Sequence, residues 1–128
     1  MGKTIFWIFW LSSIFFLSFQ DNRFVWAQDQ AEGKKLYGTY CSTCHGDNGK
    51  GDGLASKSLP VKPGDHTNGT VMNQLSDKFL FDIISKGGSA VGKSAFMPGW
   101  GSLNEKQIRD VIAYVRSIAD PPYKAPEK

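Results

Sequence analysis

The sequence predicts an all-α fold of three to five short helices. Two segments, residues 77–86 and 105–118, carry apolar residues at helical spacing, and residues 29–40 predict a third helix. No segment after residue 28 has the alternation of apolar and polar residues that is typical of a strand. The chain of 128 residues therefore predicts one small helical domain behind an N-terminal leader.

The helix over residues 105–118 has the clearest pattern. Its apolar face follows the spacing i, i+3, i+4 and i+7 in Ile108, Val111, Ile112 and Val115. Its charged residues, including Asp110 and Arg116, are expected to lie largely off that face. Asn104 is the expected N-cap, and Gln107 fits the third position of a capping box.

The two other helices also contain residues that indicate a helix end or a helix crossing. Ser76 is the expected N-cap of the helix over 77–86, and Gly87 and Gly88 are expected to end it. Gly33 lies inside the helix over 29–40, where glycine costs about 1 kcal/mol relative to alanine. A glycine in this place suggests that another helix crosses there.

The N-terminus predicts a secretory signal peptide over residues 1–27. Lys3 precedes the apolar run from Ile5 to Phe19, and Val25-Trp26-Ala27 provides a cleavage site of small-residue type. Cleavage after Ala27 would leave residues 28–128 as an exported, periplasmic domain. An uncleaved membrane anchor facing the periplasm is the alternative.

The charge of the domain is nearly balanced. The chain has a net charge of +3, and removing Lys3, Arg23 and Asp21 with the leader lowers it to +2. The remaining lysines are scattered, whereas a nucleic-acid partner would need a concentrated basic patch. No nucleic-acid partner is therefore expected.

The segment from Cys41 to His45 reads Cys-Ser-Thr-Cys-His, the attachment motif of c-type haem. Each thiol would add to one vinyl group, and the histidine would become the proximal iron ligand. A redox dithiol would need a βαβ context, which this sequence lacks. A structural zinc site would need four ligands, and a simple disulfide would leave His45 without a role. The motif therefore predicts one covalently bound haem c.

The sixth position of the iron is assigned to Met97. Met97 precedes Pro98, which favours an extended loop, and its soft thioether would raise the reduction potential relative to imidazole. Met72 and His66 are the rival ligands. An iron left open at this position would instead bind small ligands or peroxide.

The chain resembles the small monohaem class I cytochromes c over about residues 30–119. The resemblance is carried by Gly33, Tyr37, the segment 41–46, the glycines of 49–53, Met97-Pro98 and the terminal helix around 108–115. It implies a helix crossing near Gly33 and Tyr114 around one covalent haem. It also implies thioethers at Cys41 and Cys44, with His45 and Met97 as axial ligands.

The resemblance further implies that a backbone carbonyl near a proline holds Nδ1 of His45. The Leu59-Pro60 region is the first candidate, and Pro63 is equally available. Trp100 is expected either to donate its indole N–H to a haem propionate or to be buried as core.

Together these features predict a monomeric one-electron carrier rather than an enzyme. It would dock transiently with a redox donor and an acceptor at the exposed haem edge, as part of electron transport such as a respiratory chain. A membrane-bound oxidase or reductase is a possible partner. The alternatives are a haem subunit of a larger oxidoreductase and the open-site haem protein described above.

Overall fold

The computed structural model describes residues 28–125, so the expected signal segment 1–27 lies outside the described residues. The described chain is all-α, as predicted. Its helices are α1 (Gln30–Tyr40), α2 (Ser42–His45), α3 (Gly69–Met72), α4 (Asp77–Lys86) and α5 (Glu105–Ser117). Two 3-10 helices, η1 (Leu54–Ser58) and η2 (Gly88–Val91), lie in the connections. In residues 28–125 the strand-like pairing is limited to one isolated bridge, between Asn68 and Asp120.

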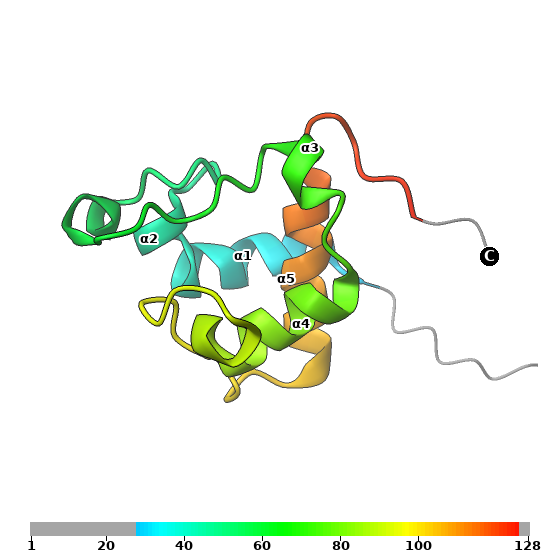
Figure 1. The fold of residues 1–128 in the computed structure, drawn as a ribbon. Helices are drawn as coiled ribbons and strands as arrows, with labels where there is room; N and C mark the ends of the chain where they lie inside the picture. The colour runs from blue at the N-terminus through cyan, green and yellow to red at the C-terminus, as the bar shows by residue number, and fades with distance from the viewer. Residues whose placement is uncertain (1–27, 126–128) are drawn as a thin grey trace, which may run out of the picture.

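Helices α1 and α5 cross at the centre of the molecule (Figure 1). A Cβ atom added at Gly33 would collide with the backbone carbonyl of Asp110 and crowd Cβ of Tyr114. Only a glycine lets the two helix backbones approach this closely. The predicted crossing near Gly33 and Tyr114 is confirmed.

The helix ends follow the predicted caps. Ser76 accepts a hydrogen bond from the N–H of Phe79, and α4 ends at Gly87, which has a φ of 86°. Asn104 and Gln107 form a full capping box at the start of α5, with both hydrogen bonds at 2.9 Å. These short-range contacts depend on neighbouring residues, which is why the sequence predicts them well.

The core gathers around the inner faces of α1, α4 and α5. Tyr37, Ile108, Val111 and Ile112 are at most 2% exposed, and Leu80 and Ile84 bring α4 against them. The apolar face predicted for α5 is thus the buried one. No helix within residues 28–125 has both the length and the hydropathy that a membrane span requires.

Two charged residues of α5 do not lie off the buried face as expected. Asp110 is 1% exposed, and its carboxylate accepts hydrogen bonds from the N–H of Asp29 and from Lys106 Nζ, at 2.9 and 2.7 Å. The bond to Asp29 fastens the start of α1 to α5 beside the crossing. A buried carboxylate is tolerated because both of its oxygens are paired.

Arg116 is the second exception, at 8% exposure. Its guanidinium donates to the carbonyl oxygens of Met72 and Leu75 and to the carboxylate of Asp77. The ring of Tyr123 lies 3.8 Å from the guanidinium carbon. Arg116 therefore ties the segment between α3 and α4 to α5, a role that helical periodicity does not reveal.

Candidate haem-binding site

A cavity of about 630 Å³ lies beside the turn that follows α1. Its largely apolar wall is formed by parts of all five α-helices and by the loops that contain Gly64 and Met97. Small-molecule and cofactor sites typically measure about 300–1,000 Å³, so the cavity has the size of a cofactor site. The residues of the Cys-Ser-Thr-Cys-His motif with reactive side chains, Cys41, Cys44 and His45, all line it.

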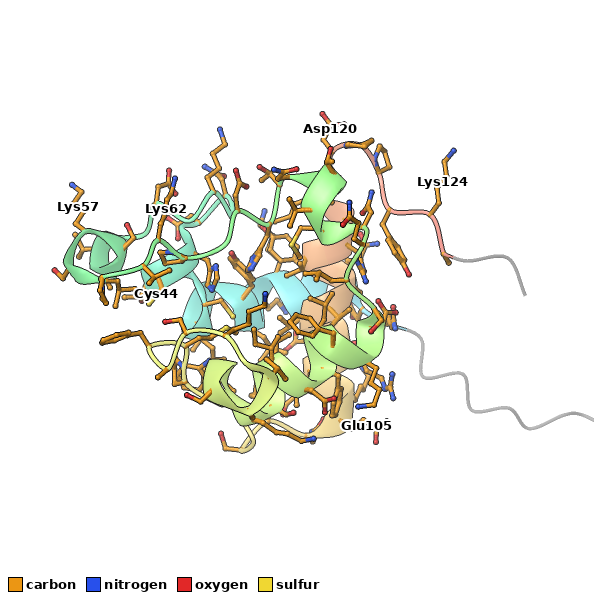
Figure 2. All side chains as sticks on the ribbon, in the orientation of Figure 1. Cys44, Lys57, Lys62, Glu105, Asp120 and Lys124 are labelled. Atoms are coloured by element: carbon orange, nitrogen blue, oxygen red, sulfur yellow. The ribbon has the colours of Figure 1, made fainter. Side chains whose placement is uncertain are left out.

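The two cysteines are free thiols on the cavity wall. Cys41 follows α1 directly, and its N–H donates to the carbonyl of Tyr37 at 2.8 Å. Figure 2 shows Cys44 toward the end of the molecule that also carries Lys57 and Lys62. Burial, reinforced by the nearby Cys44, raises the pKa of the Cys41 thiol to about 12. Cys41 is therefore a neutral thiol at pH 7.

His45 is held by one ring nitrogen. Its Nδ1 lies 3.0 Å from the carbonyl oxygen of Gly64, and since a carbonyl can only accept, Nδ1 carries the proton. Nε2 then keeps its lone pair. Burial lowers the pKa of His45, which further favours the neutral ring, although the Gly64 bond acts in the opposite direction. Metal-binding histidines are oriented in this way.

Of the two candidate regions for the acceptor, the structure excludes Leu59–Pro60: the carbonyl is that of Gly64, directly after Pro63. The reason lies in the loop that follows the motif. His66 donates its backbone N–H to the carbonyl of Gly49 at 2.6 Å. This bond brings residues 63–66 back beside the segment that directly follows the motif. A proline does stand beside the acceptor, as the resemblance implies, and it is Pro63 rather than Pro60.

The ring of His66 lies against the ring of His45. The two ring centroids are 4.2 Å apart and the ring planes are inclined by 21°. Nδ1 of His66 also forms a 3.0 Å hydrogen bond with the Tyr37 hydroxyl. Burial, and then the neighbouring His45, lowers the pKa of His66 to about 3. His66 is thus a neutral, half-buried ring, and no periodicity in the sequence indicates this contact.

Both candidate thioethers, Met97 and Met72, line the cavity. Met97 lies on the loop between η2 and α5, and its carbonyl accepts the N–H of Gly88 at 2.9 Å. A side chain at Gly87 would crowd that carbonyl, so the close turn there needs glycine. Met72 ends α3 and is 5% exposed within the core. The loop of Met97 is thus fastened at its backbone.

The two aromatic residues near Met97 behave differently. Trp100 lines the cavity, donates its backbone N–H to the carbonyl of Ile84 at 2.7 Å, and packs on Tyr40 with ring centroids 5.1 Å apart. Phe96 also lines the cavity but is 58% exposed. Trp100 is therefore part of the wall, whereas Phe96 lies on its rim.

The donor set fits a haem better than a bare metal ion. In residues 28–125 no three His, Cys, Asp or Glu side chains are grouped to hold a metal ion, whereas a structural zinc site needs four ligands. A porphyrin supplies four nitrogens itself and requires only axial donors from the protein. The apolar cavity, the two thiols on its wall and the free Nε2 of His45 together meet those needs.

The chain matches the family model described as cytochrome c oxidase, cbb3-type, subunit III, over residues 28–115. No curated protein matches it. Among solved structures it resembles a chain of the Kuenenia stuttgartiensis reducing HAO-like protein complex Kustc0457/Kustc0458, with a TM-score of 0.58 and 29% identity. That match covers 75% of this chain and 47% of the solved chain, so this protein spans about half of the length of that relative.

The family match and the architecture agree. The match extends over most of the chain and includes the motif, the cavity wall and the crossing of α1 with α5. The all-α fold is the one that the sequence predicts. The chain therefore belongs to the cytochrome c oxidase, cbb3-type, subunit III family, and it is a small class I cytochrome c, an electron-transfer haem protein.

Proposed function

We propose that the protein is an exported one-electron carrier with one covalently bound haem c. Cys41 and Cys44 are the thioether sites, His45 is the proximal iron ligand and Met97 is the distal one. The observation that carries the proposal is the hydrogen bond from His45 Nδ1 to Gly64 beside two free thiols on one cavity wall. This bond leaves Nε2 as the nitrogen for a metal.

Each of these residues has a task that follows from its chemistry. The bound haem would supply one-electron cycling of its iron. Both thiols would hold the group by adding across its vinyl double bonds, a step without any change of oxidation state. His45 and Met97 would bind the iron in both of its states, and the soft Met97 sulfur would favour the reduced one. The apolar wall keeps water away and sets the potential together with the ligands.

The position of His66 argues against it as the distal ligand. Its ring is stacked on His45 and bound to Tyr37, so it lies on the same side of the site as the proximal ligand. Reaching the opposite face would break both contacts. Met72 is packed in the core at the end of α3, whereas Met97 lies on a loop, which favours Met97.

Electrons would leave and enter near the thioether end of the molecule. Two apolar residues that line the cavity are exposed, with Val61 at 59% and Phe96 at 58%. We propose that a donor and an acceptor dock here transiently, through interfaces below about 1,200 Å². The carrier would be a periplasmic monomer, released by cleavage after Ala27.

The second candidate function is that of a haem subunit in a larger oxidoreductase. The description of the family, which names an oxidase subunit, favours it, and so does the likeness to a chain of an HAO-like protein complex. In that case the protein would be retained by an uncleaved N-terminal anchor or by protein contacts. It would still pass single electrons and catalyse no reaction itself.

A redox titration of the purified holoprotein, followed by optical spectroscopy, tests the ligand assignment. The ferric protein should have the weak far-red band of sulfur-to-iron charge transfer. Met97→Ala should lose the band, and the matched control Met72→Ala should keep it. A five-coordinate high-spin spectrum of the unaltered protein would contradict the carrier and favour the open-site alternative.

Intact mass and fractionation separate the carrier from the subunit. The carrier predicts a soluble monomer that consists of residues 28–128 and one haem. Recovery only in membranes, or only in a complex with other chains, would favour the subunit.

A further inference from the structure

We propose that His66 is a positioning residue that fixes the ring plane of the proximal ligand His45. This inference rests on the proposed function, since it takes His45 as the iron ligand. It adds a residue that the haem motif does not contain. His66 would act through its ring face and would not touch the iron.

The first step is that one hydrogen bond leaves the His45 ring partly free. The bond from Nδ1 to the Gly64 carbonyl fixes the direction of that nitrogen, but a carbonyl accepts over a broad range of angles. The ring can therefore still rock about the bond. A flat group at 4.2 Å and nearly parallel, as His66 is, removes that freedom because the rocking ring would collide with it.

The second step is that His66 is itself held rigidly. Its backbone N–H donates to the carbonyl of Gly49, and its Nδ1 is bonded to the hydroxyl of Tyr37. Tyr37 is 1% exposed and lies edge-on to the ring of Tyr114 in α5, at 5.1 Å between centroids. A continuous series of contacts thus runs from α5 through α1 to the face of His45.

The third step is that this place selects an imidazole over a plain apolar side chain. A leucine would fill the space but would offer no flat face to His45. It would also leave the buried Tyr37 hydroxyl without its partner, which carries a free-energy cost. A phenylalanine would restore the flat face but not the hydrogen bond. The two functions of the ring can therefore be separated by substitution.

The experiment is proton NMR of the ferric holoprotein, together with its reduction potential. The shifted haem-methyl resonances report the planes of the axial ligands. His66→Leu should change the order or spread of these resonances and shift the potential. His66→Phe should return the methyl pattern toward that of the unaltered protein. Tyr37→Phe, which keeps the ring and removes the hydroxyl, should give a smaller change of the same kind.

The control is Leu103→Ala, which removes a buried side chain away from the cavity wall. It should lower stability while the methyl pattern stays unchanged. The same change of pattern in Leu103→Ala and His66→Leu would overturn the proposal, since the effect would then be general loosening. An unchanged pattern and potential in His66→Leu would overturn it as well.

If His66→Leu gives no holoprotein, the Tyr37→Phe variant tests the proposal in its place. An unchanged haem-methyl pattern in Tyr37→Phe would then overturn the proposal. Failure of the underlying function would look different. His45→Ala would then keep the low-spin spectrum of the unaltered protein, whatever residue stands at position 66.

Discussion

Gly33 of α1 lies against the backbone carbonyl of Asp110 in α5, where no Cβ atom would fit. The carboxylate of the same residue, Asp110, accepts a hydrogen bond from the N–H of Asp29 at the start of α1. Asp110 therefore contacts α1 through its backbone and through its side chain. The crossing brings the motif at the end of α1 into a fixed place relative to α5. The site is therefore built on a contact between two helices rather than on its own loop.

We expect Gly33→Ala to destabilise the holoprotein by about 1–3 kcal/mol, because the added methyl group overpacks the crossing. Gly38 provides a matched control in the same helix, since an added Cβ there meets nothing within 4 Å. Gly38→Ala should stabilise the protein by up to about 1 kcal/mol. Urea unfolding followed by circular dichroism measures both. Equal effects of the two substitutions would contradict the crossing.

Removing Arg116 should be far more harmful than removing its acidic partner. Arg116→Leu leaves the carbonyl of Leu75 without its donor and takes from the carbonyl of Met72 one of its two donors, the other being the N–H of Leu75. A buried unsatisfied group costs about 1–3 kcal/mol. Asp77→Asn alters only a half-exposed ion pair, which is worth about 1 kcal/mol or less. Chemical unfolding of the two variants gives the comparison. A greater loss in Asp77→Asn would refute this ranking.

Single replacement of each motif cysteine should change how the haem is attached. Cys41→Ala and Cys44→Ala each keep one thiol on the cavity wall, so each should carry haem through one thioether. The double variant should lose its haem on denaturation. Mass spectrometry of the denatured proteins and the pyridine haemochrome spectrum test this. Retention of haem by the denatured double variant would rule out thioether attachment at these residues.

Acid should remove the contribution of the Asp29 cap. The backbone N–H of Glu32, followed by that of Ala31, lowers the pKa of Asp29 below 3.8, although desolvation opposes this. A lowered carboxyl pKa gives stability that is complete above the unfolded pKa and is lost as pH falls through the folded one. The stability difference from Asp29→Asn should therefore be constant near neutral pH and shrink below pH 3.8. A difference that grows on acidification would contradict the sign.

Local signals explain what the sequence predicts well. The caps at Ser76 and Asn104 are decided within four residues, and the face of α5 is decided by spacing alone. The motif from Cys41 to His45 is likewise contiguous. Gly33 also marks a long-range contact that the sequence predicts, because a glycine inside a helix costs stability unless another backbone comes close.

The features that were not predicted depend on distant segments. The stacking of His66 on His45, and the choice of a carbonyl beside Pro63 rather than one near Pro60, depend on a loop without periodicity. Arg116 and Asp110 have the charge of surface residues, and their hydrogen-bond partners, most of them on other segments, allow burial. Helix α3 has four residues, too few for a spacing pattern to be recognised.

The bridge between Asn68 and Asp120 has a practical consequence for anyone who handles this chain. Asp120 donates to the carbonyl of Thr67 and accepts from Gly69, both at 2.9 Å, so the tail beyond α5 is strapped across the segment next to His66. A chain cut after Ala119 would keep the residues of every described helix but lose the two hydrogen bonds of Asp120. Affinity tags are therefore better joined beyond Tyr123, whose ring packs on Arg116, and a truncation made to aid crystallisation would loosen the segment next to His66 first.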